Sequence, residues 1–174
     1  SDLRKTIKTL QENGMKGLIL DVRSNPGGLL DSAVEIAGMF VKPDALVVYT
    51  LDRDKQKVDY SAPGGKEHLL DIPMVVLVNG GSASGSEIVA GCLQDYRRAL
   101  ILGTKTFGKA SVQTVIPLAE GAALRLTTAK YYTPEGRLIH EEGIHPDITV
   151  EQRDLTKAST KEEEVFDALE QKEN

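Results

Sequence analysis

Two short segments of the chain carry residues that could form a nucleophile and its base. Ser84 lies in the Gly-rich run 79–87, directly before an apolar helical pattern, and Lys109 follows in a glycine-flanked turn. A serine at a helix start is surrounded by backbone N–H groups without intrahelical partners, at the positive end of the helix dipole. Such groups stabilise the oxyanion that forms when a hydroxyl attacks a carbonyl carbon. The segment therefore predicts acyl-transfer chemistry at Ser84.

A serine hydroxyl is a weak nucleophile and needs a base, and Lys109 is the candidate. A lysine can act as a base where burial lowers its pKa, and the neighbours of Lys109 are apolar or small. On a strand that begins near Lys109, alternation places Lys109, Ser111 and Gln113 on one face. Gln113 is therefore predicted to hold the lysine amine, as orienting groups do in other catalytic triads.

The same residues also have a purely structural interpretation. Ser84-Gly85-Ser86-Glu87 fits the capping box, in which the serine side chain caps a backbone N–H and the glutamate reaches back to the serine N–H. A nucleophile can occupy a cap position, so the two interpretations are compatible.

A second alternative is a phosphate-binding loop. Residues 103–109 fit the pattern G-x-x-x-x-G-K and follow an apolar strand pattern. However, Ala110 stands where the Mg²⁺-binding hydroxyl belongs, and the β pattern after Lys109 provides no helix N-terminus for a phosphate. We therefore expect no nucleotide site.

The histidines offer weaker candidates. Ser84 with His140 or His145 and Asp147 makes a Ser-His-Asp triad on paper, but no spacing favours it. The two histidines lie in a loop with Gly and Pro rather than at helical i, i+4 ligand spacing, which argues against a metal site. We expect solvated loop histidines, His68 included, and neither metal nor cofactor.

Composition limits the remaining classes. The chain has 174 residues, 40% of them hydrophobic and 27% charged, which suits one domain with a sizeable core. Its net charge of −5, with no dense basic patch, argues against nucleic acid as the main partner. The single Cys92 excludes an intramolecular disulfide, and its apolar surroundings predict a buried thiol. No segment approaches the roughly 20 apolar residues of a membrane span.

Hydrophobic periodicity predicts the elements that position the candidate residues. Helices are expected over 2–13, from the turn 23–28 to about 40, over 84–96 and, marginally, around 165–169. Strands are expected over 17–22, 45–50, 57–61, 74–78, 99–102, 112–118 and 124–132, with a short strand at 137–139 and a polar loop at 62–70. This order predicts an α/β core with crossover connections and an antiparallel β extension.

Three ordered motifs carry a family resemblance. Residues 18–28, 79–95 and 103–113, together with Gly143-Ile144-His145-Pro146-Asp147, resemble the carboxyl-terminal processing (tail-specific) proteases of the S41 family. The resemblance covers roughly 15–150. It implies a crotonase/ClpP-like core of ββα units and a serine endopeptidase that cleaves polypeptides near their C-termini without metal or cofactor.

The resemblance also implies roles for individual residues. Ser84 would be the nucleophile, Lys109 the general base and Gln113 its orienting partner. The oxyanion hole would use the backbone N–H of Gly85 and a second one from the turn Pro26-Gly27-Gly28, with Gly27 favoured over Gly28 on this interpretation.

The chain departs from the family pattern in some respects. Gly85 and Ala110 stand where alanine and glycine are commoner, which should change loop stiffness more than chemistry. The family's PDZ domain and N-terminal segments are not in this chain, so residues 1–174 are expected to be one catalytic core domain of a longer parent protein. The resemblance implies an extracytoplasmic location and allows an oligomer. The alternative is a non-catalytic module that binds ligands or peptides on the same fold; the presence of Ser84, Lys109 and Gln113 together favours the enzyme.

Overall fold

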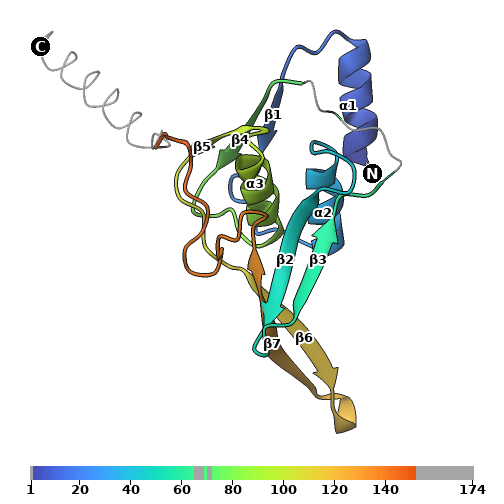
Figure 1. Cartoon of the computed structure of the whole chain (residues 1–174), viewed down its shortest axis with the longest axis vertical. Helices are drawn as coiled ribbons and strands as arrows, with labels where there is room; N and C mark the ends of the chain where they lie inside the picture. The colour runs from blue at the N-terminus through green and yellow to red at the C-terminus, as the bar shows by residue number, and fades with distance from the viewer. Residues whose placement is uncertain (1, 65–68, 70–71, 152–174) are drawn as a thin grey trace, which may run out of the picture.

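The computed structural model describes residues 2–64, 69 and 72–151, and it contains two four-stranded sheets (Figure 1). The first sheet is parallel, in the order β1-β4-β5-β8. Its strands are β1 (Leu18–Asp21), β4 (Met74–Val78), β5 (Leu100–Gly103) and β8 (Ile148–Thr149). β1, β4 and β5 are short apolar runs, the pattern typical of parallel strands covered by other elements.

The second sheet is antiparallel, in the order β3-β2-β7-β6. Its strands are β2 (Leu46–Asp52), β3 (Lys57–Ser61), β6 (Ser111–Pro117) and β7 (Ala123–Tyr132). β6 and β7 form a long hairpin, closed by the 3₁₀ turn η1 (Ala119–Gly121), that projects away from the body (Figure 1).

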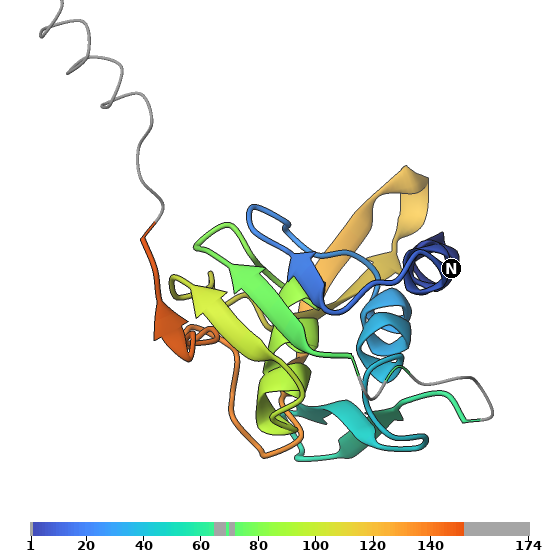
Figure 2. The ribbon, with the colours of Figure 1, turned by 90° about the horizontal axis from the view of Figure 1, so that it is seen from above.

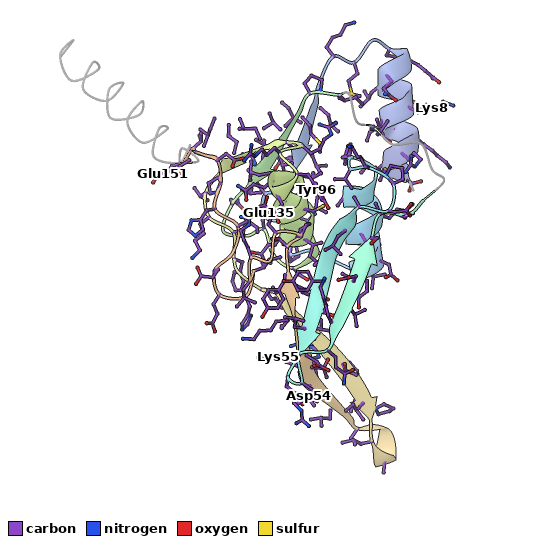
Figure 3. All side chains as sticks on the ribbon, viewed as in Figure 1. Lys8, Asp54, Lys55, Tyr96, Glu135 and Glu151 are labelled. Atoms are coloured by element: carbon purple, nitrogen blue, oxygen red, sulfur yellow. The ribbon has the colours of Figure 1, made fainter. Side chains whose placement is uncertain are left out.

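The charged turn that joins β2 and β3 is fixed by one side chain. Asp52 Oδ1 accepts hydrogen bonds from the backbone N–H groups of Asp54 and Gln56, each at 2.8 Å. Lys55 takes up a positive φ of 61° at this turn. Figure 3 shows that Asp54 and Lys55 lie at the end of the β2–β3 pair where the β6–β7 hairpin leaves the body.

Three helices complete the described part of the chain: α1 (Asp2–Glu12), α2 (Leu30–Gly38) and α3 (Gly85–Asp95). α3 is buried from Gly85 to Leu93 and packs against α2, β2 and β5 (Figure 2). The largest fully buried side chains come from both sheets, from α1 and α3, and from the segment after α2; they include Phe40, Met39, Val47, Val76, Leu93 and Ile101. Ser84 therefore directly precedes the most deeply buried of these three helices.

Most of the predicted elements are confirmed within a few residues, and so is the mixed α/β architecture with an antiparallel extension. The strand predicted over 137–139 is wrong, since that segment makes only an isolated bridge between Tyr132 and Leu138. β8 was not predicted, because two residues are too short for a periodic signal. The helix predicted around 165–169 and most of the loop 62–70 lie outside the described residues. None of the helices in the described ranges is long and apolar enough to cross a membrane.

Candidate active site

Ser84 occupies a strained turn between strand β4 and helix α3. Its backbone has φ 54° and ψ −117°, a conformation that non-glycine residues rarely adopt. Such strain persists where the surrounding structure enforces it, and it clusters at functional sites. A sharp strand-to-helix turn that presents a serine is also the geometry of the nucleophile elbow of α/β-hydrolases. The turn presents Ser84 as a half-buried side chain.

The neighbouring serines have structural roles instead. Ser82 is fully buried and its hydroxyl donates to the Val22 carbonyl oxygen at 2.7 Å. The Ser86 hydroxyl donates to the Asn25 carbonyl oxygen at 3.0 Å. Both bonds attach the serine-rich turn to the segment after β1, which fixes the position of Ser84 between them.

A buried carboxylate joins the backbone of Ser84 to that of Lys109. Glu87 is 0% exposed, and its Oε2 accepts hydrogen bonds from the N–H groups of Ser84 and Lys109, each at 2.9 Å. Its Oε1 accepts from Thr106 Oγ1 at 2.5 Å and from the Gly108 N–H at 2.7 Å. The glutamate half of the predicted capping box is thus present, and the same side chain also holds the loop that carries Lys109.

Thr106 extends this network to the segment 143–147. Its buried hydroxyl accepts the Ile144 N–H at 2.7 Å while it donates to Glu87, and its own N–H donates to the Ile144 carbonyl oxygen at 3.1 Å. The next residue, Phe107, donates its N–H to the Ser82 carbonyl oxygen at 3.0 Å. The loop that carries Lys109 is therefore held against the nucleophile turn on one side and against 143–147 on the other.

The side chains of Lys109 and Gln113 are not joined to Ser84 in this structure. Both are exposed, and within the described residues neither makes a side-chain hydrogen bond. The burial expected for Lys109 is not observed. The physical reason is alternation along the loop: Thr106, Gly108 and Ala110 face inward, so Lys109 points outward between them. The structure brings together the backbones of Ser84 and Lys109, but no hydrogen bond joins their side chains in the described part of the chain.

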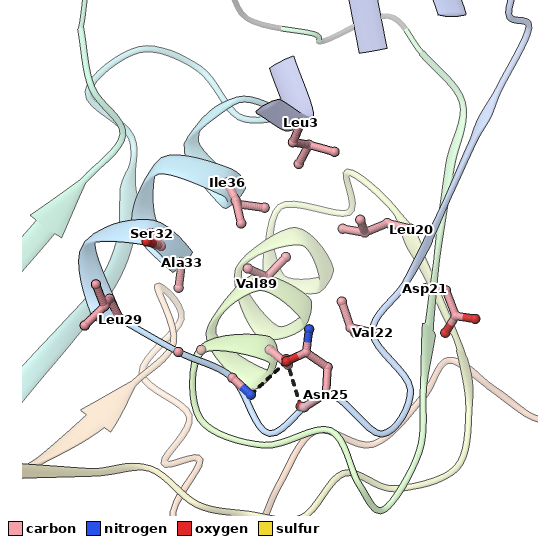
Figure 4. A pocket seen from close by; sticks show the side chains of 14 residues that line it. Leu3, Leu20, Asp21, Val22, Asn25, Leu29, Ser32, Ala33, Ile36 and Val89 are labelled. Atoms are coloured by element: carbon pink, nitrogen blue, oxygen red, sulfur yellow. Dashed lines mark hydrogen bonds between the residues drawn. The ribbon is translucent and has the colours of Figure 1, made fainter. Parts of the chain in front are cut away.

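The turn after β1 lies directly against Ser84. A Cβ on Gly27 would lie 2.5 Å from both the Ala83 carbonyl oxygen and the Gly85 nitrogen, and Gly27 has a φ of 92°. The position therefore requires glycine. The Gly27 N–H, which the family resemblance favoured as an oxyanion donor, donates to Asn25 Oδ1 at 2.9 Å in this structure (Figure 4).

Two other N–H groups are available beside Ser84. In the described part of the chain, neither the Gly85 N–H nor the Gly28 N–H makes a hydrogen bond. The two residues are close neighbours, since a Cβ on Gly85 would lie 3.3 Å from the Gly28 nitrogen. The structure thus differs from the expectation for Gly27 and offers Gly28 as the second donor of the turn.

A pocket of about 280 Å³ opens next to these two N–H groups. We call it the Gly85 pocket. Its walls are the backbone of Gly27, Gly28 and Gly85 and mainly apolar side chains, including Leu3, Leu20, Val22, Ile36 and Val89 (Figure 4). It can accept an apolar side chain whose carbonyl group lies at the free N–H groups.

The alternative sites are not assembled. Lys109 is followed by the strand β6, as predicted, so residues 103–109 do not lead into the helix N-terminus that a phosphate loop uses. The Asp147 carboxylate accepts hydrogen bonds from Gln94 Nε2 and the Ile101 N–H, each at 2.8 Å, so it is committed to the fold. His145 is exposed and His140 is partly exposed, and no hydrogen bond links either to Ser84 or Asp147 among the described residues. His68 lies outside those residues.

No group of three or more potential metal ligands occurs within 2–64, 69 and 72–151. Asp21 and Arg23, at the end of β1, form an ion pair in which Arg23 Nη2 lies 2.7 Å from Asp21 Oδ2. The hydrogen bonds from Arg23 lower the pKa of Asp21. This pair fixes the strand end from which the turn to Gly27 departs.

The structure adds two residues to the site that sequence reasoning did not assign there, Glu87 and Thr106. Glu87 carried a signal, since it stands at the third position of the α3 N-terminus, where a capping glutamate belongs. Thr106 had none, because a threonine in a loop is typical of solvated turns. Their contacts span 19 to 38 residues, and only the folded chain shows them.

The sequence profile of peptidase family S41 matches residues 1–150. The chain belongs to peptidase family S41. A carboxy-terminal-processing protease of Bartonella bacilliformis is 51% identical over 156 residues, which cover 87% of this chain and 36% of that protein. A carboxyl-terminal-processing protease of Synechocystis is 46% identical over 151 residues, 87% of this chain and 35% of that protein.

Solved structures of the S41 family share the fold. A photosystem II D1 C-terminal processing protease superposes with a TM-score of 0.79 at 40% identity, over 86% of this chain and 38% of that one. The chain thus spans little more than a third of the length of these S41 relatives.

Proposed function

We propose that residues 1–174 are the catalytic core domain of a serine endopeptidase that cleaves polypeptides near their C-termini through an acyl-enzyme. In this proposal Ser84 is the nucleophile, Lys109 the general base and Gln113 the group that orients the lysine amine. Gly85 and Gly28 supply the N–H groups of the oxyanion hole, with Gly28 in the place that the sequence favoured for Gly27. Membership of family S41 supports the reaction class.

The observation that carries the proposal is the shared carboxylate of Glu87. A capped helix needs only the hydrogen bond between Glu87 and the Ser84 N–H. The additional bonds to Gly108 and Lys109 bind a loop more than twenty residues further along the chain to the same side chain. Burying a carboxylate is unfavourable unless its hydrogen bonds are satisfied, and here four donors satisfy it. This arrangement fixes the two loops relative to one another, which an acyl-transfer site requires.

The chemistry follows from these positions. Lys109 Nζ, in its neutral form, takes the proton of Ser84 Oγ as that oxygen forms a bond to the substrate carbonyl carbon. The carbonyl oxygen becomes an oxyanion at the N–H groups of Gly85 and Gly28. The C–N bond then breaks, the lysine returns its proton to the leaving amine, and an ester on Ser84 remains. Water, deprotonated by the same lysine, attacks the ester carbonyl carbon. The bond from this carbon to Ser84 Oγ breaks, the lysine returns the proton to Ser84 Oγ, and the acid product leaves.

The exposed position of Lys109 is compatible with this scheme. Catalytic hydrogen bonds are often long in free enzymes and shorten in the substrate complex. A polypeptide laid over the half-buried Ser84 covers the neighbouring loop, and removal of water favours the neutral amine. The base is thus proposed to become competent when the substrate is bound.

The Gly85 pocket supports an apolar residue on the acyl side of the cleaved bond. Leu20, Ile36 and Val89 contribute apolar walls, and Gly85 and Gly28, whose N–H groups are free, also line the pocket. A side chain in the pocket places its own carbonyl group against these N–H groups. Recognition of substrate tails by a PDZ domain, an oligomer and an extracytoplasmic location are further proposals that rest on the family resemblance.

A matched pair of lysine variants tests the proposal. In the natural protein that contains this chain, Lys109→Ala should lower kcat for a quenched peptide by about a thousandfold or more, with an unchanged thermal unfolding midpoint. Lys105→Ala, an exposed lysine of the same loop, should retain wild-type kcat. Near-normal turnover by Lys109→Ala would contradict the proposal. Peptide binding without turnover in the wild type would favour a non-catalytic module.

A further inference from the structure

Strand β6 is an edge strand that begins two residues after Lys109. It lies at one end of the sheet order β3-β2-β7-β6, and it pairs with β7 alone among the described elements. Figure 1 shows the β6–β7 hairpin projecting from the body. An unprotected edge strand is a template on which another extended chain can pair.

The hydrogen bonds at the two ends of β6 show which residues face β7. At the start, the Tyr131 N–H donates to the Ala110 carbonyl oxygen at 3.0 Å, and at the far end the Leu118 N–H donates to the Ala122 carbonyl oxygen at 2.8 Å. Facing and outward residues alternate along an antiparallel pair. The even-numbered residues from 110 to 118 therefore face β7, and the register shift at Val112/Gln113 is absorbed on β7 by Thr128.

The odd-numbered residues consequently direct their backbone groups to the free edge. Ser111, Gln113 and Val115 each present an N–H and a carbonyl oxygen there, and within the described ranges none of these groups has a hydrogen-bond partner on that side. Pro117, which has no N–H to offer, ends the series. The free edge thus carries three complete main-chain pairing positions, and Gln113 is the middle one.

We propose that the free edge of β6 binds the main chain of an extended, unfolded polypeptide substrate as an added strand. The proposal rests on the proposed peptidase function and names the substrate class and its binding surface. Main-chain pairing provides affinity without regard to sequence, as in other cases of β-strand addition. The exposed side chains of Val115 and Ile116, on opposite faces of β6, would contact alternate residues of the added strand, which favours apolar, uncharged stretches.

The position of the edge predicts a length dependence. Val115 lies six residues beyond Lys109, at most about 20 Å along an extended strand. Only a substrate that extends about six residues to one side of the cleaved bond can reach the Val115 N–H. Shorter peptides would be cleaved without its contribution.

The test uses quenched peptides of about four, eight and twelve residues, lengths on either side of that reach. In the natural protein, Val115→Pro removes one outward N–H and keeps the ladder to β7, whereas Val115→Thr keeps the N–H as a matched control. For the longest peptide, Val115→Pro should raise KM about two- to tenfold, the worth of one main-chain hydrogen bond, with kcat unchanged. For the shortest peptide, KM of Val115→Pro should equal that of the wild type. Val115→Thr keeps the N–H and changes only the side-chain contact, so for the longest peptide its KM should rise less than that of Val115→Pro. A ratio of Val115→Pro to wild-type KM that is the same for all three peptide lengths would overturn the proposal.

Amide exchange gives a second measurement that needs neither turnover nor the proline variant. The measurement uses the Ser84→Ala variant and a soluble peptide of about twelve residues, long enough to reach Val115, in which valine alternates with threonine and lysine. Binding of this peptide should slow hydrogen exchange at the backbone amides of Ser111, Gln113 and Val115. The N–H groups of Val112, Thr114 and Ile116 already face β7 and should not change. Unchanged exchange at the odd-numbered amides would overturn the proposal. So would protection of those amides without peptide, which would mean that another segment or a second copy covers the edge.

The two proposals fail in distinguishable ways. If the wild type cleaves none of the peptides but the odd-numbered amides gain protection, the edge binds polypeptide and the peptidase assignment fails. If the wild type cleaves every peptide and the amides do not respond, the site is a peptidase and substrate main chains do not pair with β6.

Discussion

Ser84 and Lys109, 25 residues apart in the chain, donate their backbone N–H groups to one carboxylate oxygen, Oε2 of Glu87. Both distances are 2.9 Å, and the carboxylate is fully buried. The position of the Ser84 turn relative to the Lys109 loop is therefore set by the side chain of Glu87. Glu87 acts as a positioning residue in the proposed reaction.

The first prediction concerns this positioning. Glu87→Gln keeps the shape but replaces one acceptor oxygen with an NH₂ group that faces N–H donors. We expect the free energy of unfolding to fall by about 2–4 kcal/mol and kcat to fall by about a hundredfold, since small misplacements of catalytic groups are costly. Urea unfolding measures the free energy, and peptide turnover measures kcat. Glu142→Gln, at an exposed glutamate, is the control. Wild-type turnover by Glu87→Gln would remove its positioning role.

A second prediction separates two adjacent glycines. Gly27→Ala forces a Cβ within 2.5 Å of the Gly85 nitrogen at a φ of 92°, whereas a Cβ on Gly28 would meet nothing within 4 Å. We expect Gly27→Ala to lower the free energy of unfolding by more than about 1 kcal/mol and to abolish turnover. Gly28→Ala should unfold within about 0.5 kcal/mol of the wild type. Equal stability of the two variants in urea would show that the turn does not pack against Ser84 as described.

The third prediction concerns the Gly85 pocket. Ile36→Ala enlarges it, so kcat/KM should shift by about tenfold toward peptides with a bulkier apolar residue on the acyl side of the cleaved bond. The comparison uses two peptides that differ only in that residue, valine or phenylalanine. Ile19→Ala, at an isoleucine that is exposed on β1, should leave the ratio unchanged. An unchanged ratio in Ile36→Ala would place the acyl-side residue elsewhere.

Cys92 provides a prediction on pH. Its thiol is fully buried, as the sequence predicted, and burial raises its pKa to about 12. In the unfolded chain the thiol ionises at about pH 8.5. The stability that this thiol contributes is therefore fully present below that pH and is lost as the pH rises toward the pKa of the folded state. Between pH 8 and pH 10, the wild type should therefore lose about 2 kcal/mol of unfolding free energy relative to Cys92→Ala. Parallel urea titrations at the two pH values measure the difference. If the wild type and Cys92→Ala differ in unfolding free energy by the same amount at pH 8 and pH 10, the burial of the thiol is contradicted.

Much of the fold could be predicted because it is encoded locally. A short, continuous apolar run such as 74–78 predicts a buried strand without any knowledge of its neighbours, and β4 has the predicted bounds. Ser84 and Lys109 stood out for the same reason, since each is flanked by residues that dictate its local backbone. β8 was missed because its place depends on Asp147, whose carboxylate accepts the N–H of Ile101 on the neighbouring strand.

The site was less predictable where contacts are long-range or fixed by one hydrogen bond. The four donors to Glu87 come from two segments, the turn at Ser84 and the loop 106–109, and the capping-box pattern connects Glu87 only to the first of them. The family resemblance favours the Gly27 N–H as oxyanion donor, but the Asn25 side chain, two residues away, accepts that N–H in the folded chain. Lys109 was expected in a buried position because its neighbours are apolar, but alternation turned its side chain outward.

The most direct test of the account is a covalent one. The natural protein is treated with a fluorophosphonate, which phosphonylates activated serines, and the modified residue is located by peptide mass spectrometry. The account predicts modification of Ser84, none at the buried and hydrogen-bonded Ser82 and Ser86, and a loss of about a thousandfold in rate for Lys109→Ala but not for Lys105→Ala. An unmodified Ser84, or modification at the same rate in Lys109→Ala, would contradict it.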